Sequence, residues 1–211
     1  MRVGAILLLL LFAGNAAAAS PPVGRYRLVG EHDVASELEL RDDGRFAYAL
    51  AAGALDERAE GRWTSDGTTV RLTTEPKPRP AVFTAGAARK TAEVPLTLKV
   101  TSPDGHGIAG VDLRVGFAAG PPVESYTQEY GWSLGPDEKR TPVWLELSIP
   151  MYGLASPRFP IAAAAANDLT FVLTPNDLGI VDFEGLPLTI GSGQLLMRRY
   201  GTTLTYVKEE N

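Results

Sequence analysis

The stretch Val94–Phe117, VPLTLKVTSPDGHGIAGVDLRVGF, alternates apolar and polar residues in two runs. The apolar positions are Leu96, Leu98 and Val100 in the first run, and Val111, Leu113, Val115 and Phe117 in the second. A period of two places each apolar set on one face of a half-buried strand. Turn-forming residues, 102–107, separate the two runs, so we predict two neighbouring antiparallel strands.

The chain before this stretch has the same pattern. Short alternating runs occur at 25–29, 37–40, 46–50, 61–63 and 70–72, and Asp-Gly pairs follow the second and fourth of them. Five short strands at nearly regular spacing are typical of a barrel or sandwich. Phe46, Tyr48 and Leu50 share one strand face and three alanines share the other, which suits a closed or closely covered sheet. Residues 53–59 read as a loop, or at most one helical turn.

Alternating prolines mark the best domain boundary. The segment EPKPRP, 75–80, cannot join a central ladder and favours an extended polyproline conformation. We therefore predict a barrel part over 20–74, a linker over 75–91 and a β-sandwich domain over 92–176. The five alanines of 162–166 predict a helix of about two turns.

The C-terminal part, 177–211, reads as four short strands. We predict that they return to the N-terminal strands and complete the barrel, which makes the sandwich an insertion. A linear run of two domains and a small hairpin unit is the alternative. In either arrangement the fold class is all-β.

Residues 1–19 have the pattern of a secretory signal peptide. Arg2 supplies a positive charge, an apolar run follows, and Ala17–Ala19 fits the small-residue cleavage rule. The apolar run is about half of the ~20 residues that a spanning helix needs, and no second run of spanning length follows. We predict a periplasmic or secreted protein with no integral membrane segment after cleavage. A retained membrane anchor is the alternative.

The composition of the chain argues against several classes of site and partner. The chain has no cysteine, so disulfides, thiolate metal sites and a lipid anchor on cysteine are excluded. Its net charge is −5 with lysine and arginine scattered along the chain, which argues against nucleic acid as a partner. Glu31, His32 and Asp33 are adjacent, but neighbouring strand residues point to opposite faces, so we predict neither a metal site nor a cofactor.

The N-terminal part resembles a known kind of barrel. Its pattern is Gly-x-Tyr, Leu-x-Leu-x-x-Asp-Gly-x-Phe, Gly-x-Trp and Val-x-Leu, carried by Gly24, Tyr26, Leu38, Leu40, Asp43, Gly44, Phe46, Gly61, Trp63, Val70 and Leu72. This is similar to small lipocalin-like barrel domains of exported bacterial proteins, such as the copper-resistance lipoprotein type. The cysteines of that family are absent here, which argues against lipidation and a copper role.

The middle part resembles the transthyretin-like or carboxypeptidase-regulatory-like sandwich, a fold of the immunoglobulin-like kind. The matching residues are Val100, Asp104, Gly105, Ile108–Val111 and Val115, although the proline that often precedes the isoleucine is missing. The resemblance implies a module for stability, adhesion or carbohydrate binding. Neither resemblance transfers a catalytic residue.

The candidate ligand-binding residues are aromatic. Tyr126, Gln128, Tyr130 and Trp132 follow one another closely, and Trp144 comes twelve residues later. If the first three share a strand face, they form an aromatic platform with a hydrogen-bonding amide, a surface that stacks on sugars or receives peptides. The alternative is that these aromatics pack the sandwich against the barrel.

No motif indicates catalysis. The paired acids lie in predicted turns, not across a cleft, and Ser192 lacks the nucleophile-elbow pattern. The leading hypothesis is an exported, non-enzymatic binding or scaffolding protein of the bacterial envelope, with carbohydrate, peptide or an envelope protein as partner. The alternatives are a lipocalin-type carrier with ligand space beside the alanines of 46–51, and a hydrolase whose acid and base come from separate strands.

Overall fold

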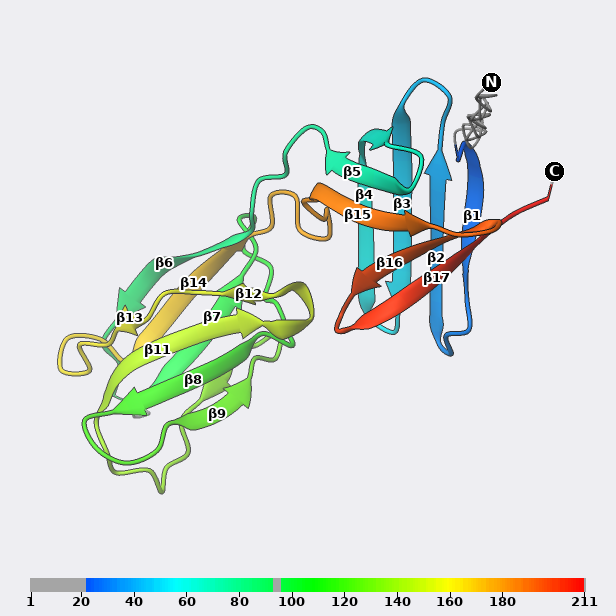
Figure 1. Ribbon diagram of the computed structural model, residues 1–211. Coiled ribbons are helices and arrows are strands. Elements are labelled where there is room, and N and C mark those ends of the chain that lie inside the picture. Colours follow the sequence, from blue (N-terminus) through cyan, green and yellow to red (C-terminus); the bar gives the residue numbers. More distant parts are fainter. Residues whose placement is uncertain (1–21, 93–95, 211) are drawn as a thin grey trace, which may run out of the picture.

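The computed structural model describes residues 22–92 and 96–210, and nearly all of its regular structure is β-strand (Figure 1). The predicted all-β class is confirmed. The predicted signal peptide, 1–19, lies outside the described residues. None of the described segments forms a helix long and apolar enough to cross a membrane.

Eight strands close into an antiparallel barrel. They are β1 (Gly24–Val29), β2 (Val34–Leu40), β3 (Arg45–Ala52), β4 (Leu55–Ser65), β5 (Thr69–Thr74), β15 (Glu184–Ile190), β16 (Gln194–Arg199) and β17 (Thr202–Lys208). Figure 1 shows β1–β4 crossing β15–β17 at a steep angle. The ring closes where β1 pairs with β17 and β5 pairs with β15, so both ends of the chain contribute to one sheet.

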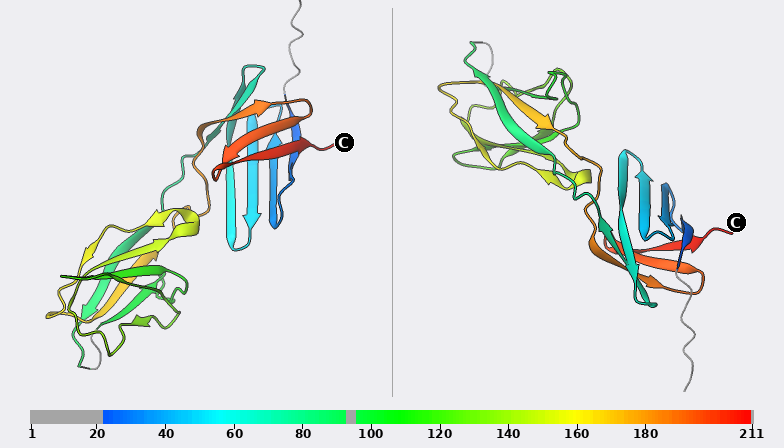
Figure 2. Two further views of the ribbon diagram at one scale, coloured as in Figure 1. Left: turned by 60° about the horizontal axis from the view of Figure 1, so that its bottom comes forward. Right: turned by 90° about the horizontal axis from the view of Figure 1, so that it is seen from above.

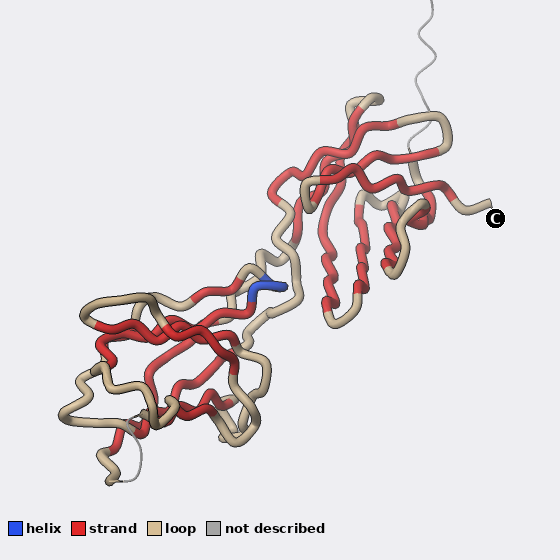
Figure 3. The backbone as a smooth tube through the Cα atoms, turned by 90° about the horizontal axis from the view of Figure 1, so that it is seen from below, coloured by secondary structure: helices blue, strands red, loops and turns tan. Residues whose placement is uncertain are grey.

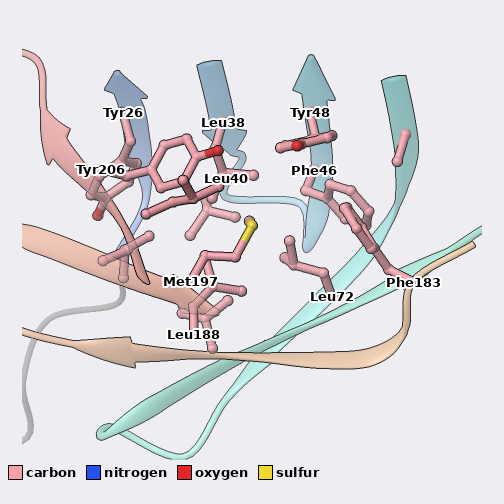
Figure 4. Packing of buried hydrophobic residues seen from close by; sticks show 14 of the residues in the cluster. Tyr26, Leu38, Leu40, Phe46, Tyr48, Leu72, Phe183, Leu188, Met197 and Tyr206 are labelled. Atoms are coloured by element: carbon pink, nitrogen blue, oxygen red, sulfur yellow. The ribbon is translucent and has the colours of Figure 1, made fainter. Parts of the chain in front are cut away.

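Apolar side chains fill the inside of the barrel. Figure 4 shows Leu38, Met197 and Tyr206 among the side chains that meet there, and each of these three is fully or almost fully buried. Ala49 and Ala51 are exposed on the outside, because they alternate with buried residues of β3. The ligand space that the carrier hypothesis placed beside the alanines is therefore not inside the barrel.

The chain between β5 and β15 forms two further sheets. One contains β6 (Val82–Arg89), β7 (Thr97–Thr101), β10 (Trp132–Ser133) and β14 (Asp168–Thr174). The other contains β8 (Asp112–Phe117), β9 (Val123–Tyr126), β11 (Pro142–Ile149), β12 (Leu154–Ala155) and β13 (Phe159–Pro160). Both sheets contribute to one apolar core, so we call 82–174 the two-sheet unit.

The two strands of the opening stretch do not pair with each other, and the predicted hairpin is wrong. β7 pairs with β10 and β14, whereas β8 pairs with β9 and β11 in the other sheet. The turn residues return only to the edge of β7, where the Ile108 N–H donates to the Val100 carbonyl over 2.9 Å. The next residues cross to the second sheet, and both apolar faces then meet in the shared core.

Four predicted segments differ from the structure. The predicted linker, 75–91, contains β6, and the predicted loop at 53–59 contains the start of β4. The tail contributes three barrel strands instead of four. The predicted helix at 161–167 is a single turn, because the bonds from the Ala165 and Ala166 N–H groups to the Ala162 carbonyl do not propagate.

Two connections join the barrel to the two-sheet unit, residues 75–81 and 175–183, and they run side by side (Figure 2). The Arg79 N–H donates to Asp177 Oδ2 over 2.8 Å, and the Asp177 N–H donates to the Arg79 carbonyl over 3.2 Å. The Asn176 amide donates to the Pro80 carbonyl over 2.9 Å. The two connections therefore brace each other.

A substitution at Gly61 tests how closely the strands of the barrel wall pack. A Cβ atom there would lie 2.0 Å from the Thr73 carbonyl oxygen, which belongs to the neighbouring strand and cannot rotate away. We expect Gly61→Ala to lower the free energy of unfolding by about 1–3 kcal/mol, measured by urea denaturation. The control is Gly135→Ala, because a Cβ at this exposed glycine meets open space. Equal stability of the two variants would contradict the packing.

Candidate functional site

The outer face of the β9–β8–β11 sheet carries aromatic and charged side chains. Leu113 and Val115 of β8 are buried, so Asp112, Arg114 and Gly116 point outward. Residues directly opposite one another share a face. The register therefore places these side chains on that outer face: Tyr126 and Ser148 beside Asp112, Glu124 and Glu146 beside Arg114, and Trp144 beside Gly116. We call this set, with Arg158, the aromatic face.

Trp144 lies flat on the backbone of the neighbouring strand. A Cβ at Gly116 would be 1.8 Å from the indole Cε2 atom, so only glycine leaves room for the ring. The Arg158 guanidinium carbon lies 4.3 Å from the ring centroid, and that of Arg114 lies 6.0 Å away. Cation–π attraction and the glycine together fix the orientation of the indole.

A chain of ion pairs crosses the aromatic face. Arg114 contacts Glu124 at 3.0 Å and Glu146 at 3.1 Å, and Arg158 contacts the other oxygen of Glu146 at 2.8 Å. Exposed ion pairs of this kind contribute only about 0–1 kcal/mol each to stability. Their effect here is to hold hydrogen-bond donors and acceptors in place next to Trp144.

The structure separates the five predicted ligand-binding residues. Tyr126 and Trp144 lie on the aromatic face, and Tyr126 is 57% exposed. Gln128 and Tyr130 lie in a tight turn beyond β9, closed by two hydrogen bonds between Gln128 and Gly131. Trp132 lies on β10 in the other sheet, partly buried against the core beside Leu98.

The predicted strand through Tyr126, Gln128 and Tyr130 fails for a local reason. Thr127 is fully buried, and its hydroxyl donates to the Ile108 carbonyl over 2.7 Å. This bond ties the chain to the crossing segment, and the positive φ of Gly131 then turns it toward the other sheet. Tyr126 and Tyr130 are both exposed, so neither packs the two units together.

Sequence reasoning missed the charged members of the aromatic face. The alternation in 111–117 predicts that Arg114 faces outward, so the sequence does contain a signal for this residue. Arg158 and Glu146 come from segments whose register with β8 the sequence does not encode locally. The glycine under Trp144 is recognisable only once β8 and β11 are known to pair.

A second polar cluster lies at the end of the barrel that carries the β16–β17 turn. Arg199 donates to Glu57 over 2.7 Å and to the Tyr48 hydroxyl over 2.8 Å, and the Tyr200 hydroxyl also contacts Glu57. The Arg199 and Glu57 side chains are only 14% and 11% exposed. The guanidinium also lies over the Tyr48, Tyr200 and Phe183 rings, so it closes this end of the core.

Burial changes the acidity of the tyrosines around this cluster. It raises the pKa of Tyr48 to about 12, and it also raises the pKa of Tyr200 and of Tyr206. The Tyr206 hydroxyl lies 2.7 Å from Ser36 Oγ inside the barrel. These phenols are therefore held neutral by their surroundings.

In the described ranges, no three His, Asp or Glu side chains lie together in a way that could hold a metal ion. Comparison with protein-family models, with curated proteins and with solved structures finds no match to this chain.

The tyrosine pKa values predict a loss of stability at alkaline pH. The phenols ionise near pH 10 in the unfolded chain, but Tyr48 ionises only near pH 12 in the folded protein. Above pH 10 the folded state therefore holds more protons, so the free energy of unfolding falls as pH rises through this window. Urea denaturation at a series of pH values tests this, with Tyr48→Phe expected to flatten the fall. A constant free energy of unfolding between pH 10 and 12 would contradict it.

Proposed function

We propose that this protein is exported to the bacterial envelope and binds an extended carbohydrate on the aromatic face, as a binding or scaffolding protein that is not an enzyme. One observation carries the proposal: Trp144 and Tyr126 project from the same face of one sheet with paired charged groups between them. The export part rests on the signal-peptide pattern of residues 1–19.

The spacing of the two aromatic residues favours a chain over a single sugar. Their β8 partners, Gly116 and Asp112, are four residues apart, which is about 13 Å along the strand. β11 and β9 flank β8, which adds about 10 Å across the sheet. The backbone positions of Trp144 and Tyr126 are thus roughly 16 Å apart, a span longer than one sugar ring.

The charged groups suit a neutral, hydroxyl-rich ligand. Arg114, Glu124 and Glu146 already pair with one another, so a ligand need not bring a charge to satisfy them. Their free lone pairs and N–H groups remain available to hydroxyls. Arg158 covers the indole, but its side chain is 60% exposed, so a sugar ring can take its place at a small cost.

The fold is consistent with the same proposal. We assign the barrel to the lipocalin-like kind, on its eight antiparallel strands, and the two-sheet unit to the immunoglobulin-like or transthyretin-like sandwiches, on its two sheets around one core. Sandwich modules with these resemblances include carbohydrate-binding ones. The barrel then acts as the support for the module that binds.

Carbohydrate binding is tested by affinity electrophoresis in gels that contain soluble polysaccharides, including glucans, chitin oligomers and peptidoglycan fragments. We expect at least one polysaccharide to retard the protein, and Trp144→Ala and Tyr126→Ala each to weaken its binding about tenfold. Gly116→Ala should weaken binding as well, because it displaces the indole.

The matched control is Tyr130→Ala, which removes an exposed tyrosine of the turn beyond β9 that is not part of the aromatic face, and it should leave retardation unchanged. The proposal fails if no polysaccharide retards the protein. It also fails if Trp144→Ala and Tyr126→Ala, folded by circular dichroism, migrate as the parent does. Binding of a peptide or an envelope protein by the same face would replace carbohydrate as the ligand.

A further inference from the structure

A cleft of about 510 Å³ lies where the barrel meets the two-sheet unit. The barrel contributes Glu57 and Arg199, the two connections contribute 77–81 and 177–182, and the two-sheet unit contributes Tyr152–Leu154. Figure 3 shows the 3-10 helix Pro150–Tyr152 next to the connections, at the end of the unit that faces the barrel. Clefts of this size at domain junctions are common ligand sites.

The walls of this cleft are held by hydrogen bonds. The Arg58 N–H donates to the Gly179 carbonyl and the Val181 N–H donates to the Arg58 carbonyl, each over 2.9 Å. These bonds fix the second connection to β4, and the bonds between the connections fix the first. Because the walls are ordered before a ligand arrives, little ordering entropy opposes binding.

The charged side chains that line the cleft are balanced, with three cations and three anions. Arg199 pairs with Glu57 at 2.7 Å and Arg79 pairs with Asp177 at 3.6 Å. Lys77 pairs with Asp182 at 3.2 Å and also with Glu184, outside the lining, at 2.5 Å. A ligand with one sign of charge would face partners of the same sign, which is unfavourable. A ligand that carries one positive and one negative group can form ion pairs with both partners of such a pair, so no charged group is left without an opposite charge.

Apolar groups line the rest of the cleft. Tyr152 and Leu154 come from the two-sheet unit, and Ile180 and Val181 come from the second connection. Tyr200, which contacts Glu57, is 55% exposed, so a further aromatic ring is accessible next to this lining. The ligand that matches this lining has an apolar body between its charged ends.

We propose that the cleft binds small zwitterionic ligands with an apolar body, such as a short peptide with free amino and carboxyl ends. Lys77 and Asp182 contact the two ends, and Tyr152 contacts the apolar body. This site is separate from the aromatic face, and its ligand does not depend on the carbohydrate proposal.

The test is isothermal titration calorimetry of the full chain with the dipeptide leucyl-phenylalanine. The comparison ligand is the same dipeptide with an acetylated amino end and an amidated carboxyl end. We expect the free dipeptide to bind at least about tenfold more tightly than the blocked one, since only the free form carries both charges. Lys77→Ala and Tyr152→Ala should each weaken binding about tenfold.

Two control variants locate the site. Lys139→Ala removes an exposed cation from a distant loop, and Trp144→Ala alters the aromatic face, so neither should change dipeptide binding. Equal binding of the free and blocked dipeptides, or no binding of either, overturns the proposal. So does full binding by Lys77→Ala and Tyr152→Ala. A loss of polysaccharide binding in Trp144→Ala with unchanged dipeptide binding would keep the two proposals distinct.

Discussion

The structure depends on the closure of the barrel by strands from opposite ends of the chain. β1 pairs with β17 and β5 pairs with β15. The first five strands therefore form a closed sheet only together with the last three. Leu188, Leu195 and Tyr206 of the last strands complete a core that Leu38 and Phe46 of the early strands begin. Barrel closure satisfies the edges that an open sheet of the early strands would expose.

Closure also dictates how the second unit is attached. A segment that leaves after β5 and returns before β15 must begin and end at neighbouring strands of the barrel. The two connections are therefore forced to run together, and the bonds between Arg79, Asp177 and Asn176 use this proximity. A double connection of this kind restrains the junction more than a single linker does, which is why a cleft there has ordered walls.

Much of the fold could be predicted from local pattern. Alternation identified the inward faces of β2, β3 and β8, because burial follows a period of two. Pairing was harder. The turn-rich segment after Thr101 has the composition of a hairpin, but it crosses between sheets because the apolar faces of β7 and β8 bury the same core from opposite sides. Composition does not distinguish these two outcomes.

In the candidate site, too, the residue types could be predicted from the sequence, whereas the strand pairing that brings them together could not. Tyr126 and Trp144 were found as aromatic residues, but their placement on one face requires the register of three strands. Gln128 and Tyr130 were misplaced because one buried hydroxyl, that of Thr127, ends the strand early. Gly116 looks like any strand glycine until Trp144 is seen to lie on it.

The lack of cysteine is consistent with the position of the two proposed binding surfaces outside the two cores. A chain without disulfides draws its stability from buried apolar area, so large side chains occupy the inside of the barrel. The surfaces that stay free are the outer sheet faces and the junction. Substitutions on the outer face of a well-packed sheet change the free energy of unfolding little, because the outer side chains contribute little to the core. Trp144, Arg114 and Tyr126 occupy such positions, so the packing of the core does not dictate which side chains stand there.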